Sequence, residues 1–381
     1  MASTLSASLS EAELEALLTW ATPARAASLL QDLANTPAPS QTPAWLRGPI
    51  IQKWWQDVVT TDLWSGRDIP NWNLNYQKTG NGVLELGNSP APIWLVAHWD
   101  CISYLIANQQ TGGSYKLVPF CLHTMMDGQQ PASVLGYSTS TQMYKVIARG
   151  TLYGGEVAYF KPDDASISLR AGQRIVIDVP MKPVNNDVDD YLYSGQMDNA
   201  AGCVAVLLAA AFLAGLNDVS ALVALTDEEE GVLATGNTSF SRGAQRLLSH
   251  LPAPDLAIIS DLHTASDTAA LGQGASLAEY ASQTRGAVTP PWLYETLRDL
   301  TSQASPDILL NEVSTSQAIN VSRSDDVSLM NATPNVVLCG VPAIGRHFAD
   351  GPDVVSAVDI AHTARSLVLI ACWAARAWLK S

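Results

Sequence analysis

The stretch that decides the fold reads IWLVAHWD and spans residues 93–100. Its first five residues, Ile93 to Ala97, are apolar, as in a strand that is buried on both faces of a sheet, and His98 and Asp100 follow at once. In open α/β sheets, ligands bind beyond the carboxyl ends of the strands. Polar residues that come directly after an apolar strand therefore indicate where chemistry takes place.

The chain from residue 197 onward alternates apolar strands with helical patterns. The predicted strands are Val219 to Leu225, Leu256 to Ser260 and Val336 to Val341, and the predicted helices are Ala200 to Leu216, Trp292 to Gln303 and Val358 to Leu379. Such alternation is typical of an α/β fold. We therefore predict a mostly parallel central sheet flanked by helices.

Residues 103–196 have a different texture. Short β-rich segments broken by Gly, Asp and Pro fill this region, and no long helical pattern interrupts them. We predict a small, β-rich, barrel-like domain inserted into a discontinuous catalytic domain of residues 1–102 and 197–381. Residues 1–75 form an N-terminal helical extension of that catalytic domain, and a capping-box pattern at Ser10 and Glu13 opens its first helix.

The composition argues against several partners and locations. The chain has 21 Lys+Arg against 36 Asp+Glu, and a formal charge of -15 repels phosphate backbones and anionic lipid heads. The longest apolar run, Cys203 to Leu216, is too short to span a bilayer. The five cysteines have no short-spaced pairs, and the first 35 residues lack a secretory-signal pattern. We expect a cytoplasmic protein that binds neither nucleic acid nor membranes.

Further polar groups occupy comparable places. Asp227 to Glu230, Asp261 and His347 follow predicted strands, and Asp198 immediately precedes a long predicted helix. Each alone has an ordinary explanation, such as a solvated acidic loop, a helix N-cap or a buried histidine. Together with His98 they would place several carboxylates at one sheet edge, which is costly unless cations neutralise them. Imidazole and carboxylate ligands suit Zn, Co or Mn, and a carboxylate that bridges two ions is usual in dinuclear hydrolases.

These residues, in this order, resemble the glutamyl aminopeptidase and deblocking aminopeptidase family of co-catalytic metallopeptidases. That superfamily carries His-x-Asp, a bridging Asp, Glu-Glu, Asp and His in sequence. The matches here are His98-Trp99-Asp100, Asp198 to Gly202, Glu228-Glu229, Asp261 and His347. In the glutamyl aminopeptidase family a β-rich domain lies between the first ligand and the bridging Asp, and 100 residues (198 − 98) separate those positions here.

The resemblance implies a role for each matching residue. One metal would be bound by His98, Asp198 and Asp261, and the second metal would be bound by Asp198, Glu229 and His347. In the same scheme Asp100 would orient His98 through the second ring nitrogen, as carboxylates commonly do for metal-binding histidines.

The acidic run can be aligned with the family in two registers. In the first, Glu228 is the general base that takes a proton from the activated water and Glu229 is a metal ligand. In the second, Glu229 and Glu230 take these two roles. The first register is preferred because it leaves Gly231 at the family's glycine position.

The resemblance implies an aminopeptidase with two divalent metal ions per subunit, peptide substrates with a free N-terminus and assembly into homo-oligomers. A metal-dependent deacylase or dipeptidase acting on a small amide would use the same metals and the same base. A third reading is a binding or assembly protein that kept the scaffold and lost catalysis.

Overall fold

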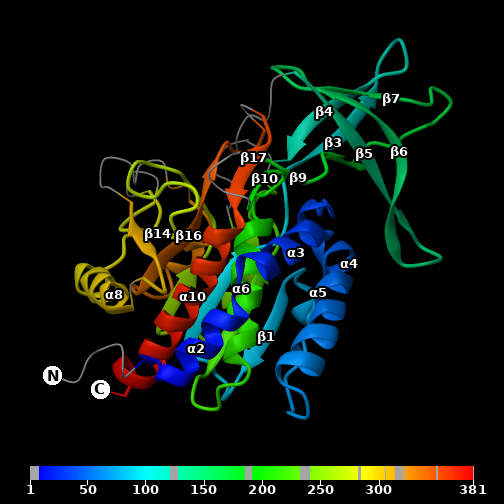
Figure 1. Ribbon diagram of the computed structural model, residues 1–381. Helices are drawn as coiled ribbons and strands as arrows, with labels where there is room; N and C mark the ends of the chain where they lie inside the picture. Colours follow the sequence, from blue (N-terminus) through cyan, green and yellow to red (C-terminus); the bar gives the residue numbers. More distant parts are fainter. Residues whose placement is uncertain are drawn as a thin grey trace.

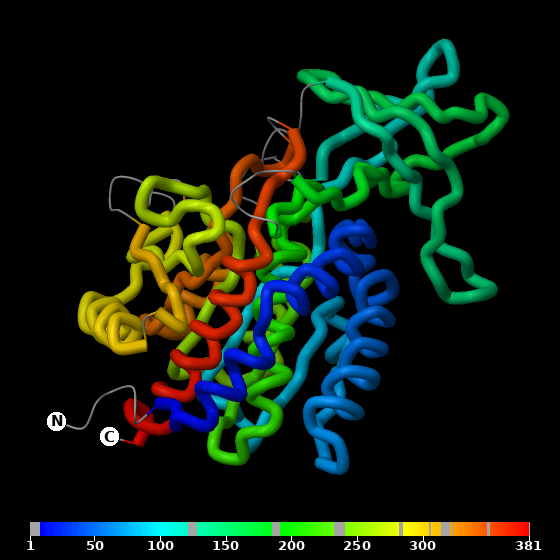
Figure 2. The backbone as a smooth tube through the Cα atoms, viewed as in Figure 1, coloured from blue at the N-terminus to red at the C-terminus, as the bar shows by residue number. Residues whose placement is uncertain are grey.

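The computed structural model describes residues 8–120, 128–184, 191–231, 241–281, 285–304, 306–313, 321, 323–348 and 351–380. Within these ranges the chain forms a large sheet covered by helices and a smaller group of strands that stands to one side (Figure 1). The beginning and the end of the described chain lie side by side (Figure 2), because Arg376 donates to the carbonyl of Ser8 and to the carboxylate of Glu13.

The helices lie mainly in the N-terminal extension and between the strands of the large sheet. They are α2 (Glu11–Trp20), α3 (Pro23–Ala34), α4 (Pro43–Leu46), α5 (Gly48–Trp54), α6 (Ala200–Leu213), α7 (Arg242–Leu248), α8 (Pro291–Ala304), α9 (Asp326–Leu329) and α10 (Ala357–Trp373), with the π-helices η1 (Trp55–Leu63) and η5 (Ala374–Trp378) and the 3-10 helix η2 (Tyr76–Lys78). The predicted capping box at Ser10 and Glu13 is confirmed at the start of α2.

The large sheet is mixed. Its strands are β1 (Gly82–Leu86), β2 (Ile93–His98), β9 (Lys182–Pro183), β10 (Leu192–Gly195), β11 (Ala221–Thr226), β12 (Leu256–Ile259), β13 (Leu262–Thr264), β14 (Ala275–Ala278), β15 (Leu310–Glu312), β16 (Val336–Ile344) and β17 (Asp353–Ser356). The main order is β1-β11-β2-β12-β16-β17-β10-β9.

The expectation of a mostly parallel sheet holds only for the centre. Strands β11, β2, β12 and β16 are parallel, whereas β1, β17, β10 and β9 pair antiparallel at the two sides. Parallel neighbours need a long crossover, whereas β17 follows β16 after a short connection and can only turn back. The four central strands therefore direct their carboxyl ends to one edge.

Hydrophobic layers cover both faces of this centre. In β2, Ile93 and Leu95 join the apolar cluster that includes α6 and α10, whereas Trp94 and Val96 join the cluster on the other face, which includes residues of α7 and α9. This alternation follows from the two-residue period of a strand. Burial on both faces makes the strand ends a rigid platform.

The apolar helices of the sequence are core helices. Every residue of α6 is buried, which explains the apolar run noted in the sequence. In the described chain, the continuous helix Ala357–Trp378 is long and apolar enough to cross a membrane, but 89% of its most apolar stretch is buried inside the protein. It therefore gives only weak evidence of a membrane span.

The region between Ser103 and Ile177 supplies a second group of strands. They are β3 (Ser103–Gln109), β4 (Tyr115–Phe120), β5 (Gln129–Ser138), β6 (Met143–Tyr153), β7 (Tyr159–Pro162) and β8 (Arg174–Ile177). They pair in the closed order β3-β4-β7-β6-β5-β8 around a hydrophobic cluster of their own. Figure 1 shows this lobe above α3 and α4, beyond the end of the large sheet.

The N-terminal extension packs against the large body. The indole of Trp20 donates to the carbonyl of Leu208 in α6 (2.9 Å), and Arg365 of α10 donates to the carbonyl of Ala21 (3.0 Å). Beyond α3, the chain passes under the lobe and reaches the carboxyl end of β2, where Pro39 forms a parallel bridge with Cys101. The extension thus ends next to the strand that carries His98.

Candidate metal centre

One edge of the sheet collects every predicted site residue. His98 ends β2, Asp227 to Glu230 follow β11, Asp261 follows β12, His347 follows β16, and Asp198 immediately precedes the cap of α6. Parallel pairing brings these strand ends together, and Thr226 lies opposite His98 in the register. All of these site residues are buried. The sheet topology therefore produces the cluster that the sequence pattern suggested.

Asp198 lies between two histidines. Its Oδ1 is 3.3 Å from His98 Nε2, and its Oδ2 is 3.2 Å from His347 Nε2. On the first side, His98 Nε2 is also 3.5 Å from Asp261 Oδ1. On the second side, His347 Nε2 is 2.9 Å from Glu230 Oε1. Among the described residues, three groups of possible ligands have atoms within 4.8 Å of one another. Two of them, His98 with Asp198 and Asp261, and Asp198 with Glu230 and His347, share the Asp198 carboxylate, and the third combines His98, Glu229 and Glu230.

The donor atoms of this cluster fit divalent cations. Among the described residues, several buried atoms of the cluster have no hydrogen-bond partner, namely His98 Nε2, Asp198 Oδ1, Asp261 Oδ2 and both Glu229 oxygens. Unpaired buried polar atoms are costly, and those of one site are rarely left without a role. Imidazole nitrogen and carboxylate oxygen are ligands for Zn, Co and Mn. The chemistry of the donor set therefore fits such ions.

The electrostatics of the cluster are those of crowded acids. Burial raises the pKa of Glu229 well above its usual range, and the neighbouring Glu230 and Asp261 raise it further. Burial opposes the charged form of Asp198 too, but Arg346 and the two histidines hold the pKa of that carboxyl well below its usual range. One acid is therefore stabilised as an anion while its neighbour is driven towards protonation.

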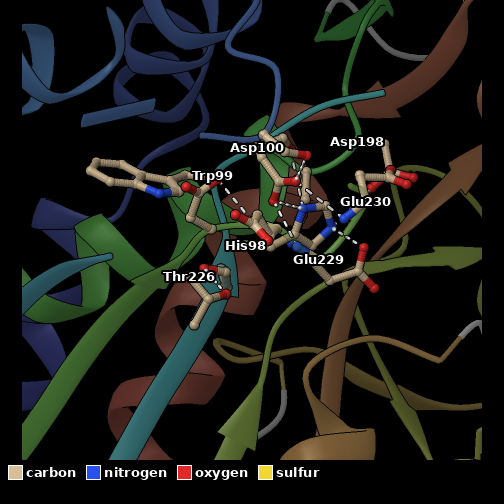
Figure 3. A network of polar contacts seen from close by, with 12 residues as sticks. His98, Trp99, Asp100, Asp198, Thr226, Glu229 and Glu230 are labelled. Carbon is tan, nitrogen blue, oxygen red and sulfur yellow. Dashed lines mark hydrogen bonds and ion pairs between the residues drawn. The ribbon is translucent and has the colours of Figure 1, made fainter. Parts of the chain in front are cut away.

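Asp100 connects His98 with the acidic loop. Its Oδ1 accepts the backbone N–H of Glu229 and its Oδ2 accepts that of Glu230, both at 3.2 Å. His98 Nδ1 lies 3.5 Å from Asp100 Oδ1 and 3.2 Å from its main-chain oxygen. Figure 3 shows Asp100, His98, Glu229 and Glu230 gathered in one cluster. Asp100 can therefore fix the relative position of the histidine and both glutamates.

The three glutamates of the loop point to different partners. Glu228 forms ion pairs with Arg242 Nε (3.1 Å) and Arg246 Nη2 (2.9 Å), and its φ of 57° turns the chain sharply. Glu229 faces His98, with Oε2 3.8 Å from Nε2. Glu230 contacts His347. Of these three side chains, Glu229 is the one whose two carboxylate oxygens have no hydrogen-bond partner among the described residues.

Two neighbours hold Asp198 in place. Asn199 caps α6 by accepting the N–H of Gly202 (2.9 Å), and its amide donates to the carbonyl of Ser260 (2.8 Å). Asp353 Oδ2 accepts the N–H of Met197 at 3.1 Å. Because Asn199 is the N-cap, the carboxylate of Asp198 is not used for capping and can face the histidines.

Arg346 is a site residue that the sequence analysis missed. Its Nε lies 3.1 Å from Asp198 Oδ2 and 3.3 Å from His347 Nε2, and its side chain is 25% exposed. The buried acids around Asp198 raise the pKa of this guanidinium above its usual value. Its position directly before His347 was the available signal. Arg346 therefore places a positive charge within the second group of possible ligands.

A scan against protein-family models and a search of curated proteins find no match for the sequence. Among solved structures, the chain is similar to a TET aminopeptidase from the marine sediment archaeon Thaumarchaeota archaeon SCGC AB-539-E09, with a TM-score of 0.68, 15% identity, and coverage of 91% of this chain and 95% of that one. It is similar to the TET1 peptidase of Pyrococcus horikoshii, with a TM-score of 0.67, 15% identity, and coverage of 90% and 98%.

A third similar structure is the aminopeptidase APDkam598 from the archaeon Desulfurococcus kamchatkensis, with a TM-score of 0.65, 18% identity, and coverage of 91% and 94%. All three comparisons span nearly the whole of both chains. At such low identities they establish a shared peptidase fold, and a fold by itself does not determine the reaction.

Proposed function

We propose that this chain is a metal-dependent aminopeptidase with two divalent metal ions at Asp198. The observation that carries the proposal is that two buried groups of possible ligands share this carboxylate. Several atoms of these groups have no hydrogen-bond partner among the described residues. The names of the structures with the same fold, which are aminopeptidases, support the reaction class.

We assign the two ions to the two groups of residues. One ion would be bound by His98, Asp198 and Asp261, and the other would be bound by Asp198, Glu230 and His347. When bound, the two cations lower the pKa of water and polarise the carbonyl group of the substrate.

The second register of the acidic run is the better supported. Glu230 Oε1 lies 2.9 Å from His347, as a co-ligand should, whereas Glu228 is committed to two arginines. We therefore assign the general base to Glu229 and give Glu228 the task of anchoring the loop. This assignment replaces the preferred register of the sequence analysis, in which Glu228 was the base and Glu229 the ligand.

The protein's own groups then have distinct tasks. Glu229 accepts a proton from the attacking water and passes it to the leaving amine, because its two oxygens are buried beside His98 and bind no other donor among the described residues. Asp100 keeps His98 and the backbone of Glu229 in register. Exclusion of water by the buried surroundings strengthens each of these electrostatic interactions.

The proposed substrates are peptides with a free N-terminus. The excess of acidic residues, 36 Asp+Glu against 21 Lys+Arg, favours the approach of a cationic α-amine. We also propose homo-oligomers, because the TET1 peptidase of the same fold can assemble into a tetrahedron or a large octahedral shell. The lobe exposes several large apolar side chains that a contact between subunits could cover, namely Tyr137, Met143, Val146, Val157 and Tyr159.

Mass spectrometry of a peptide mixture tests the reaction. The protein is stripped of metal, reconstituted with Zn, Co or Mn in turn, and incubated with peptides whose N-termini are free or acetylated, with Glu229→Gln as the inactive control. Stepwise loss of residues from free peptides only supports the aminopeptidase. Release of acetate alone would point to a deacylase, cleavage of dipeptides alone to a dipeptidase, and no cleavage with any metal to a non-catalytic scaffold.

A further inference from the structure

A segment of the N-terminal extension, Ala38–Gln41, lies against the loops that carry the catalytic acids. Its Pro39 forms a parallel bridge with Cys101, and the N–H of Cys101 donates to the carbonyl of Ala38 (3.0 Å). A few residues later, the buried Arg47 donates to the carbonyl of Trp99 (2.7 Å). The extension is therefore attached to the chain on either side of Asp100.

Ser40 is the residue of this segment that touches Asp100. Its hydroxyl donates to Asp100 Oδ2 at 2.6 Å, and both residues are fully buried. The same carboxylate accepts the N–H groups of Glu229 and Glu230. A short hydrogen bond to a charged group is among the stronger kinds and limits its orientation. Ser40 therefore helps to orient the Asp100 carboxylate, which accepts the backbone N–H groups of Glu229 and Glu230.

Gln41 continues the attachment to the acidic loop. Its backbone N–H donates to Asp227 Oδ1 (2.9 Å), and its side-chain amide donates to Glu228 Oε1 (3.0 Å). The amide oxygen of Gln41 accepts from Arg174 Nη2 of β8 (2.9 Å). One side chain thus links the lobe, the extension and the loop that carries Glu229.

The packing around Ser40 is tight. A Cβ atom built on Gly231 would overlap the Ser40 hydroxyl and would lie 2.5 Å from Phe120 Cε1. Glycine is therefore needed where the acidic loop passes the extension.

We infer that Ala38–Gln41 is a positioning element of the active site, in which Ser40 orients Asp100 and Asp100 in turn orients His98, Glu229 and Glu230. The inference rests on the proposed function for its catalytic meaning, and its effect on cation binding is independent of the substrate. Ser40 itself touches none of the proposed ligands in the contacts described, so its role is one of positioning.

Ser40→Ala in the full-length, cobalt-reconstituted protein tests the inference. We expect kcat for Leu-p-nitroanilide and Glu-p-nitroanilide to fall about tenfold with KM within about twofold, the lower end of what partners of ligands contribute. The visible absorption of bound Co²⁺, which depends on ligand geometry, should change, and the affinity for Co²⁺ should fall several-fold. A loss of stability without misplacement of the acids would not move these readouts.

Thr289→Val is the matched control. Thr289 is fully buried, and its hydroxyl donates to the carbonyl of Val336 at the start of β16, the end of the sheet opposite the candidate metal centre. The Thr289→Val variant loses one buried hydroxyl hydrogen bond, as Ser40→Ala does, and should keep the wild-type kcat and Co²⁺ spectrum. Wild-type kcat, spectrum and Co²⁺ affinity in Ser40→Ala, or equal losses in both variants, would overturn the inference.

Two further measurements apply when Ser40→Ala does not fold or when the wild-type protein cleaves no substrate. If Ser40→Ala does not fold, Ser40→Cys replaces the hydroxyl with a slightly larger and weaker donor, and it must lower kcat in the same direction. Wild-type kcat in this variant would overturn the inference. If the wild-type protein cleaves neither anilide nor any peptide of the mixture, the proposed function fails. The Co²⁺ spectrum and affinity of Ser40→Ala then still decide whether Ser40 positions the ligands.

Discussion

Arg346→Met should destabilise the metal-free protein and strengthen its binding of metal. In the absence of metal, Arg346 is a cation in contact with Asp198, at 3.1 Å. Removing one partner of a buried ion pair typically costs ~3–5 kcal/mol. Since a quarter of the Arg346 side chain is exposed, we expect a smaller loss, about 2 kcal/mol. Methionine keeps most of the volume, so the change is mainly one of charge.

Bound cations would neutralise Asp198 themselves and make Arg346 redundant. The metal-loaded form should then lose little stability, and by linkage the variant should bind metal about 30-fold more tightly, which corresponds to the same ~2 kcal/mol. Urea unfolding in EDTA and in saturating Zn²⁺ measures the stabilities, and calorimetric titration measures the affinity. Equal stability of variant and wild type in EDTA, or weaker metal binding by the variant, would refute the reasoning.

The remaining predictions concern the acids and the metal. Glu229→Gln should lower kcat about 10²–10⁴-fold with metal content retained. Glu228→Gln, which weakens two ion pairs, should lower the unfolding temperature and have a smaller effect on kcat. A larger loss of kcat in Glu228→Gln than in Glu229→Gln would favour the first register. Burial raises the pKa of the Asp326 carboxyl from 3.8 to about 6. The native state therefore keeps a proton that the unfolded state releases, and the protein loses stability as pH rises from about 4 to 6. In urea titrations over this range, wild type should lose up to about 3 kcal/mol relative to Asp326→Asn, and a pH-independent difference would contradict this. Metal removal by EDTA should lower the unfolding temperature of wild type, as measured by scanning calorimetry. The same unfolding temperature with and without EDTA would count against a metal that binds only the native state.

The strand ends could be predicted from the sequence because the pattern is local. Apolar runs such as Ile93 to Ala97 form strands wherever they are buried on both faces, and the polar residues that follow them share an edge in a parallel centre. The nearness of His98 and Asp261 follows from that topology, whereas Asp198 reaches the same group from the start of α6. The antiparallel sides of the sheet could not be predicted so directly, since they depend on short connections such as that between β16 and β17.

The acidic loop marks where local reasoning ends. The sequence offers Glu228, Glu229 and Glu230 in a row, and spacing alone cannot say which carboxylate meets which partner. That choice depends on Arg242 and Arg246, which come from α7 and draw Glu228 away from the centre. These arginines lie 14 (242 − 228) and 18 (246 − 228) residues after Glu228, so the acidic run by itself does not indicate the pairing.

The contacts of Ser40 with the residues around the candidate metal centre could not be predicted from the sequence either. Ser40 lies 60 residues from Asp100 and 191 residues (231 − 40) from Gly231, in an extension to which the sequence assigned no role. An ordinary serine in a Pro-rich link predicts a turn, and only the fold brings its hydroxyl to the carboxylate. The glycine at position 231, read at first as a mark of register, is explained by the lack of space beside Ser40.

The central claim is that two metal ions share Asp198, and anomalous X-ray diffraction from crystals loaded with Zn²⁺ tests it most directly. We predict two anomalous peaks about 3.5–4 Å apart, one beside His98 and Asp261 and one beside His347 and Glu230, with Asp198 between them and Glu229 near both but bound to neither. A single peak, or a second zinc bound by Glu228 or Glu229 in place of Glu230, would contradict the account.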